Sequence, residues 1–221
     1  MMKWRPYGRN AILIDFAEKP DDWALAKRLR IIEALSTKAP PQLAEFVPGF
    51  TNVLIEFDLS PNDTLESLGN ETIQFLETNT RQKVPLGPVK RIPVQYDGMD
   101  LNRVADCNSI TVEKLIKYHS DPLYTVHLLG FSPGFPYLGE LHHKLYTPRL
   151  ASPRPRVEAG SVAIGGQHTG IYTVESPGGW NIIAHTTQKI FDLSQRTAES
   201  EESAFLLRPG DQVKFVPATD S

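Results

Sequence analysis

The chain has little of several features that would restrict its class. Its 221 residues include one cysteine, Cys107, which excludes an internal disulfide bond and a cysteine-rich metal cluster. The 23 Lys and Arg residues nearly balance the 26 Asp and Glu residues, so charge gives no general reason to bind nucleic acid. No apolar run approaches the ~20 residues of a membrane span, and the first residues lack the apolar stretch of a signal peptide. We therefore expect a cytoplasmic protein that binds neither nucleic acid nor membrane.

Metal and nucleotide signatures are also missing. The histidines are residues 119, 127, 142, 143, 168 and 185, and they show neither H-E-x-x-H spacing nor a cysteine partner, so we expect no metal site. Neither G-x-x-x-x-G-K-[ST] nor G-x-G-x-x-G occurs, which excludes the standard phosphate-binding loops. Cys107 has no neighbouring base in the sequence, and we interpret it as a small, half-buried apolar side chain.

The first part of the chain alternates apolar runs with amphipathic segments. One helix is expected to begin at Asp21 or Asp22 and to be stopped by Pro40 and Pro41. A second helix is expected over residues 62–78, and the expected strands are residues 10–16, 43–47, 53–57 and 89–96. This order predicts a ferredoxin-like βαββαβ domain in an α+β protein. Residues 80–88 carry the Pro and Gly residues of a linker, so we place the domains at residues 1–88 and 89–221.

The second part has a different character. One helical patch is expected over residues 101–119. From residue 123 onward the chain consists of short apolar runs separated by Gly and Pro, which is typical of a β-sandwich or β-barrel.

Residues 130–139 read GFSPGFPYLG and form the densest motif. Ser132 satisfies a G-x-S-x-G pattern, but Pro133 lacks the backbone N–H that the oxyanion hole of a nucleophile elbow requires. We therefore interpret the motif as a stiff aromatic loop. Phe131, Phe135 and Tyr137 are either anchors for a partner protein or part of the barrel core.

Two further motifs supply polar groups. Residues 147–157 hold three arginines among prolines, and their guanidinium groups suit carboxylate or phosphate; the alternative is a solvated loop. Residues 165–180 combine paired glycines with polar side chains, namely Gln167, Thr169, Tyr172, Glu175 and Ser176. These side chains either converge on a pocket wall, or the segment is a pair of β-turns with structural glycines.

Together these motifs resemble the B-subunit family of 5-oxoprolinase, also described as allophanate hydrolase subunit 1 or KipI-like. The resemblance rests on GFSPGFPYLG, TPRLASPR (residues 147–154), ESPGGW (residues 175–180) and LRPGDQVKF (residues 207–215). It implies a ferredoxin-like domain followed by a cyclophilin-like β-barrel. It also implies that the chain works with A and C subunits of 5-oxoprolinase to open 5-oxo-L-proline to L-glutamate with ATP.

The resemblance leaves the catalytic residues unassigned. We expect Arg149 or Arg154 to bind an anionic group and residues 167–176 to shape the pocket, with Trp180 at the partner interface. Because no nucleotide loop is present, we expect the isolated chain to be inactive and ATP to be used by the complex. Two alternatives stay open: a regulatory module that inhibits a sensor histidine kinase, and a carboxyltransferase-like component acting on urea or another amide.

Overall fold

A computed structural model describes residues 2–80, 85–197 and 201–218. It divides into two compact units, Met1–Pro85 and Leu86–Ser221, each with its own hydrophobic core. Residues 81–84 of the expected linker lie outside the described residues. Within the described ranges, no helix combines the length and the apolar character needed to cross a bilayer.

The helices of the first unit begin at capping residues that the sequence supplies. The described elements run in the order β1 (Lys3–Tyr7), β2 (Ala11–Asp15), α1 (Asp22–Lys38), β3 (Leu43–Pro48), β4 (Asn52–Phe57) and α2 (Leu65–Asn79). The Asp21 carboxylate accepts a hydrogen bond from the Ala24 N–H at 2.9 Å, and Thr64 caps α2 in the same way. The two predicted helices are therefore confirmed, and the second one begins at Leu65, three residues later than expected.

The sheet of the first unit is antiparallel, with strand order β1-β2-β4-β3. Ile12 and Ile14 of β2 face the same core as Val53 and Ile55 of β4, as the two-residue period of a strand requires. The strand β1 was missed, because it is a largely exposed edge strand with a polar sequence. Assigning residues 89–96 to this sheet was wrong, and the ferredoxin-like arrangement is not confirmed.

The helical patch of the second unit is split in two. Its helices are α3 (Leu101–Cys107) and α4 (Val112–Ser120). Between them Ser109 has a positive φ of 52°, which no helix continues through, and Thr111 caps α4. Cys107 is exposed, which corrects the expectation of a half-buried side chain: it ends a short helix whose buried residues are Val104 and Ala105.

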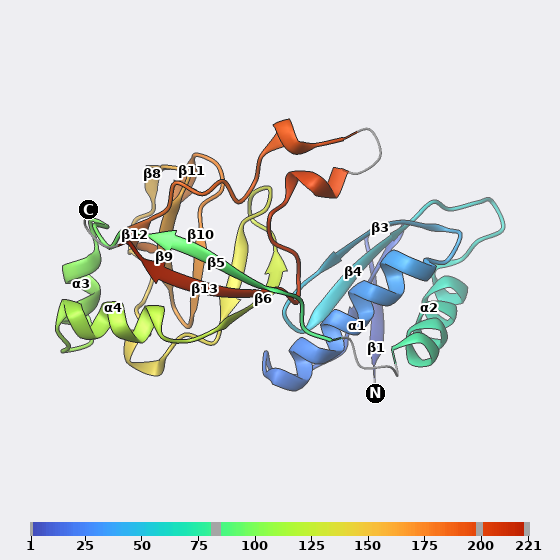
Figure 1. The fold of residues 1–221 in the computed structure, drawn as a ribbon. Coiled ribbons are helices and arrows are strands. Elements are labelled where there is room, and N and C mark those ends of the chain that lie inside the picture. The colour runs from blue at the N-terminus through green and yellow to red at the C-terminus, as the bar shows by residue number, and fades with distance from the viewer. Residues whose placement is uncertain (1, 81–84, 198–200, 219–221) are drawn as a thin grey trace. The chain divides into compact units, whose positions relative to one another are not determined.

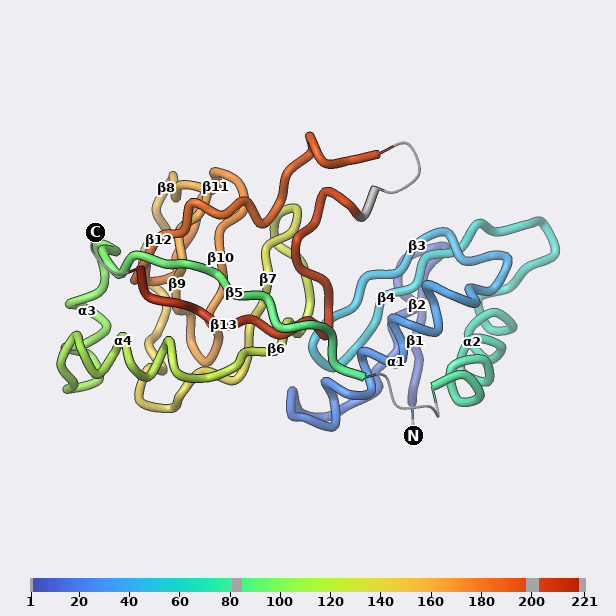
Figure 2. Tube along the Cα trace, in the orientation of Figure 1, coloured from blue at the N-terminus to red at the C-terminus, as the bar shows by residue number. Residues whose placement is uncertain are grey.

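The remaining elements of the second unit are β-strands and short 3₁₀ turns (Figures 1 and 2). The strands are β5 (Val89–Val94), β6 (Tyr124–Leu129), β7 (Pro136–Gly139), β8 (Arg154–Val157), β9 (Ser161–Gly165), β10 (His168–Ile171), β11 (Ser176–Gly178), β12 (Asn181–His185) and β13 (Gln212–Pro217). The turns are η1 (His143–Leu145), η2 (Leu193–Gln195) and η3 (Glu201–Ala204).

Seven of these strands form a nearly closed, barrel-like sheet in the order β12-β9-β10-β7-β6-β13-β5. The strand β5 pairs in parallel with β13, whereas the other neighbours are antiparallel. The two edges meet where Gln95 and His185 exchange backbone hydrogen bonds of 2.8 Å. The prediction of an α+β protein with a barrel-like second part is therefore confirmed.

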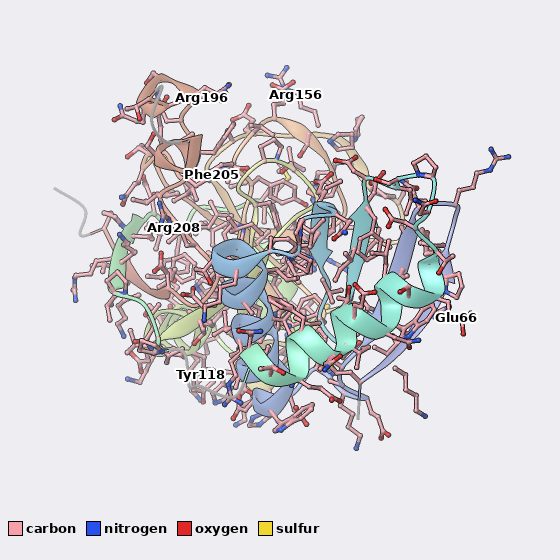
Figure 3. The ribbon with its side chains drawn as sticks, turned by 90° about the vertical axis from the view of Figure 1, so that its right-hand side faces the viewer. Glu66, Tyr118, Arg156, Arg196, Phe205 and Arg208 are labelled. Atoms are coloured by element: carbon pink, nitrogen blue, oxygen red, sulfur yellow. The ribbon has the colours of Figure 1, made fainter. Side chains whose placement is uncertain are left out.

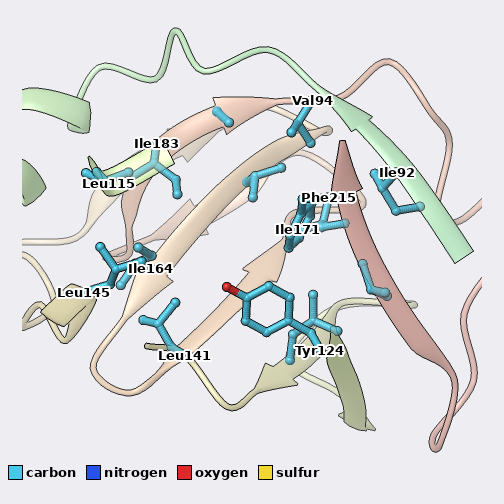
Figure 4. Close-up of a cluster of buried hydrophobic side chains, with 14 of the residues drawn as sticks. Ile92, Val94, Leu115, Tyr124, Leu141, Leu145, Ile164, Ile171, Ile183 and Phe215 are labelled. Atoms are coloured by element: carbon cyan, nitrogen blue, oxygen red, sulfur yellow. The ribbon is translucent and has the colours of Figure 1, made fainter. Parts of the chain in front are cut away.

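Branched aliphatic side chains fill the barrel (Figure 4). Ile164 and Ile171 point inward from β9 and β10, Phe215 from β13, and Leu115 of α4 closes the core; all four are fully buried. This packing leaves the outward-facing residues of β9, β10 and β12 to form a second surface.

One histidine lies inside this core. The Tyr96 hydroxyl is 2.7 Å from His119 Nδ1, and His119 Nε2 is 2.9 Å from Thr169 Oγ1. Thr169 donates its own proton to the Ala163 carbonyl, so its oxygen accepts from His119 Nε2–H, and Nδ1 accepts from Tyr96. Because complete burial penalises the charged ring, the pKa of His119 falls to about 3, and the histidine is neutral.

Candidate functional site

The outer face of the barrel carries a second apolar cluster, which we call the aromatic cluster. It consists of Phe135, Val157, Ala163, Tyr172, Trp180 and Ile182, with Tyr137 packed against it. Ala163 belongs to it because side chains alternate along β9, and its neighbours Val162 and Ile164 face the barrel interior. The cluster is thus covered on one side by the sheet, and Val157 of β8 packs on it from the other.

Glycines of the third motif make room for the aromatic rings. A Cβ atom at Gly165 would overlap the Trp180 ring, and one at Gly178 would overlap the Tyr172 ring. At Gly170 a Cβ would lie 2.9 Å from Phe135 Cζ. These glycines are therefore structural, although they lie in β9, β10 and β11 rather than in the β-turns of the second interpretation.

The rings are held edge to face around Phe135. Its ring centroid lies 5.2 Å from Tyr137, 5.2 Å from Tyr172 and 5.4 Å from Trp180, with interplanar angles of 64° to 87°. Such pairs each add about 0.5–1.5 kcal/mol beyond the area they bury. The cluster is therefore a rigid base for the side chains above it.

The three arginines of the second motif differ in their partners. Arg154 Nη2 lies 2.7 Å from Asp100 Oδ1, and Arg156 Nη2 lies 2.8 Å from Glu175 Oε2. Arg156 is exposed and extends away from the ribbon (Figure 3). Arg149 is exposed as well, with its guanidinium carbon 5.6 Å from the centroid of the Trp180 ring. No carboxylate within the described ranges pairs with Arg149, so its N–H groups are available to an anion.

The positive charge of Arg149 acts on the phenol groups of Tyr137 and Tyr172. Burial raises the pKa of Tyr137 and of Tyr172, and the positive charge of Arg149 opposes that rise at both residues. Both phenols are therefore protonated at neutral pH and can donate hydrogen bonds. The guanidinium group, with phenols nearby and an indole beneath it, is a cationic donor site of the kind that binds carboxylates.

The other predicted pocket residues are more dispersed. Gln167 is exposed in the turn between β9 and β10, and Glu175 is paired with Arg156. Ser176 is half-buried at the start of β11, and its Oγ has no hydrogen-bond partner within the described residues. The structure does not bring Thr169 to this face, because its side chain points into the barrel and binds His119.

The predicted interface residues also separate. Phe135 and Trp180 are 2% and 5% exposed, so they form the interior of the aromatic cluster, and Tyr137 is half-buried. Phe131 is 63% exposed and has a positive φ of 70°, in a tight loop where the Ser132 N–H donates to the Gly130 carbonyl. Of these four residues, Phe131 alone presents a large exposed apolar surface.

Sequence patterns missed two residues that support the arginines. Asp100 accepts from Arg154 and from the Ile182 N–H, each at 2.7 Å. Asn181 is fully buried beside Trp180. Asn181 directly follows the ESPGGW motif, which was a usable signal; nothing in the sequence pairs Asp100 with Arg154.

Comparison with known families and proteins identifies relatives. The family described as carboxyltransferase domain, subdomain C and D, matches residues 2–200. The chain is similar to the 5-oxoprolinase B subunit of Escherichia coli O157:H7, at 39% identity over 95% of this chain and 93% of the relative. The same subunit of Haemophilus influenzae (strain ATCC 51907 / DSM 11121 / KW20 / Rd) is 50% identical over 57% of each chain. That of Bacillus subtilis (strain 168) is 33% identical over 95% of this chain and 90% of the relative.

Solved structures agree in fold. The protein TTHA0988 is 36% identical and superposes with a TM-score of 0.80 over 96% of this chain, which spans 40% of that protein's length. The urea amidolyase of K. lactis, at 22% identity and a TM-score of 0.80, shares the fold over 99% of this chain and 15% of its own. The chain belongs to the B-subunit family of 5-oxoprolinase and carries its carboxyltransferase-type C and D subdomains.

Proposed function

We propose that the chain is the B subunit of an ATP-dependent 5-oxoprolinase that opens 5-oxo-L-proline to L-glutamate together with A and C subunits. Three relatives that are named as 5-oxoprolinase B subunits support this proposal. The structural observation that carries it is the exposed guanidinium of Arg149, fixed on Trp180 and without a carboxylate partner in the described part of the chain.

The geometry suits the carboxylate of the substrate. The Arg149 guanidinium lies over the Trp180 ring, and the N–H groups of a guanidinium can pair with the two oxygens of a carboxylate. The protonated phenol of Tyr172 adds an uncharged donor. Arg154 is committed to Asp100, so we propose that Arg149 contacts the anion and that Arg154 supports the site.

The helix N-termini in the described part of the chain do not suit a nucleotide phosphate. Helix N-termini bind phosphate through free N–H groups, but Asp21, Thr64 and Thr111 cap α1, α2 and α4 with their own side chains. The start of α3 carries the buried Asp100 carboxylate, which would repel phosphate. We therefore propose that ATP is used by the complex, that its phosphates bind elsewhere, and that the isolated chain does not hydrolyse ATP.

Phe131 supplies a candidate contact for the C subunit. An exposed aromatic ring on a stiff loop loses little conformational freedom on binding and suits an interface anchor. We also propose that the barrel is cyclophilin-like in architecture, which agrees with its nearly closed seven-stranded sheet.

Reconstitution tests the proposed function. The A and C subunits with the wild-type chain should show 5-oxoproline-dependent ATP hydrolysis and glutamate formation, and the chain alone should show neither. Gene deletion should cause 5-oxoproline to accumulate. A complete, folded complex without 5-oxoproline turnover would contradict the proposal.

A carboxyltransferase-like role in urea or amide processing is the second candidate. It is favoured by the match to the carboxyltransferase domain and by 26% identity to the urea amidolyase of Lachancea kluyveri, of which the chain spans 13%. Turnover of urea, but not of 5-oxoproline, by the reconstituted complex would support it. Inhibition of a histidine kinase stays a prediction, and no described feature favours it.

A further inference from the structure

The backbone on both sides of Arg149 is tied to the segment that carries Trp180. The Pro148 carbonyl accepts a hydrogen bond from Asn181 Nδ2 at 2.9 Å, and the Leu150 N–H donates to the Gly179 carbonyl at 2.7 Å. The guanidinium and the indole therefore come from two segments that are bonded to each other before and after the stacked pair.

Asn181 is the buried centre of this connection. It is fully buried, and its Nδ2 group donates to the Ile164 carbonyl at 3.1 Å as well as to Pro148. Its Oδ1 accepts from Arg103 Nε at 3.0 Å. Two carbonyls require the donor side of the amide and the arginine requires the acceptor side, so these partners fix the orientation of the amide.

A second set of hydrogen bonds holds the same segment, and one of them comes from Asp100 at the start of α3. Asp100 Oδ2 accepts from the Ile182 N–H at 2.7 Å, and Arg154 Nη1 donates to the Trp180 carbonyl at 3.4 Å. Residues 180–182 are thereby fixed, and Asn181 transmits that position to Pro148 and so to the next residue, Arg149.

We propose that Asn181 is a positioning residue that holds the Arg149 guanidinium over Trp180, and the effect on activity rests on the proposed function. Without the amide, the Pro148 carbonyl loses its buried donor, and the backbone that leads into Arg149 moves away from the indole. Arg149 keeps its charge but loses its position over the indole.

Asn181→Leu tests this, because leucine keeps the branching and approximate size of asparagine but has no donor. We expect KM for 5-oxoproline in the reconstituted complex to rise about tenfold with kcat within about twofold, because Arg149 would bind substrate and transition state alike. Tyr124→Phe is the matched control: it removes one buried hydrogen bond, from the Tyr124 hydroxyl to the His119 carbonyl, inside the barrel. Its KM should stay within about twofold of wild type, and an equal rise in both variants would overturn the proposal.

A readout independent of activity is the NMR signal of Arg149 in the full-length chain. Protons beside the face of an indole are shifted upfield, so the Arg149 Hδ and Hε resonances should lose that shift in Asn181→Leu and keep it in Tyr124→Phe. Unchanged Arg149 resonances in the folded variant would overturn the positioning role. Lost resonance shifts, together with full activity of Arg149→Ala, would leave the positioning role intact and refute the proposed substrate contact.

Arg103→Ala covers the case in which Asn181→Leu does not fold. Arg103 is exposed, and its removal frees Asn181 Oδ1 but leaves the hydrogen bonds from Asn181 Nδ2 to the Pro148 and Ile164 carbonyls in place. We expect a partial loss of the Arg149 shift and a KM rise of about threefold. No change in either measurement would contradict the proposed network.

Discussion

The guanidinium carbon of Arg149 lies 5.6 Å from the centroid of the Trp180 ring, while Arg154, five residues later, is paired with Asp100. Two arginines of one motif therefore have different roles. Arg149 has no carboxylate partner among the described residues and faces solvent, whereas Arg154 neutralises a buried carboxylate. Mutating Arg149 should therefore change kcat/KM, whereas mutating Arg154 should change the free energy of unfolding.

Arg149→Ala should lower kcat/KM for 5-oxoproline at least about tenfold in the reconstituted complex, since a charge-assisted contact to the substrate is lost. Arg149→Lys should restore activity only in part, because lysine keeps the charge but not the planar fork. The matched control is Arg156→Ala, which removes an exposed arginine of the same motif and should stay within about twofold of wild type. Equal kinetics for Arg149→Ala and Arg156→Ala would contradict the assignment.

Arg154→Ala should lower the free energy of unfolding by about 2–4 kcal/mol, because it leaves the Asp100 carboxylate buried without its cation. Arg156→Ala breaks an exposed pair and should cost about 0–1 kcal/mol. Urea denaturation of both variants measures the difference. Similar losses would show that the Asp100–Arg154 pair is not a buried interaction.

Gly165→Ala should lower the free energy of unfolding by about 1–3 kcal/mol, because a methyl group there overlaps the Trp180 ring. Gly130→Ala is the comparison: its nearest neighbour would be Leu128 Cδ1 at an ordinary 3.5 Å, and its φ is not positive. Thermal denaturation followed by near-ultraviolet circular dichroism checks both. A Gly165→Ala variant as stable as Gly130→Ala would argue against close packing of the indole on Gly165.

Stability should fall as pH is lowered through the range set by His119. Its pKa is lowered by burial from 6.5 to about 3, so between these values the unfolded chain binds a proton that the folded chain does not. Between about pH 6.5 and pH 3 this difference lowers the free energy of unfolding by about 1 kcal/mol for each pH unit, and above pH 6.5 it has no effect. Urea denaturation at about pH 7, 6, 5 and 4 should show a shallower decline for His119→Gln than for wild type. Parallel declines would mean that His119 is not neutral in the folded protein.

Phe131→Ala should weaken binding to the C subunit about tenfold or more while leaving the thermal midpoint of the isolated chain nearly unchanged, since the ring is 63% exposed. Phe135→Ala should instead destabilise the chain by about 3–5 kcal/mol, because that ring is the centre of the aromatic cluster. Calorimetric titration and thermal melts separate the two effects. Unchanged affinity for Phe131→Ala would exclude Phe131 as an anchor.

Local patterns in the sequence determined several elements. The pair Asp21 and Asp22 predicted the start of α1, because a carboxylate there satisfies free N–H groups of the first turn, and the structure assigns the cap to Asp21. The apolar residues of 10–16 and 53–57 predicted β2 and β4. Pro133 ruled out a nucleophile elbow at Ser132 from covalent structure alone. Each of these conclusions depends on atoms within a few residues of one another.

Only the tertiary structure decided which distant residues meet. It paired β5 with β13 rather than with the first sheet, turned Thr169 toward His119, and gave Arg154 but not Arg149 a carboxylate partner. Asp100 lies far from Arg154 in the sequence, and ion pairing between them follows from barrel closure rather than from any local period. Backbone preferences act over one or two turns of chain, whereas the availability of a charge is set by every group that folding brings within a few ångströms of it.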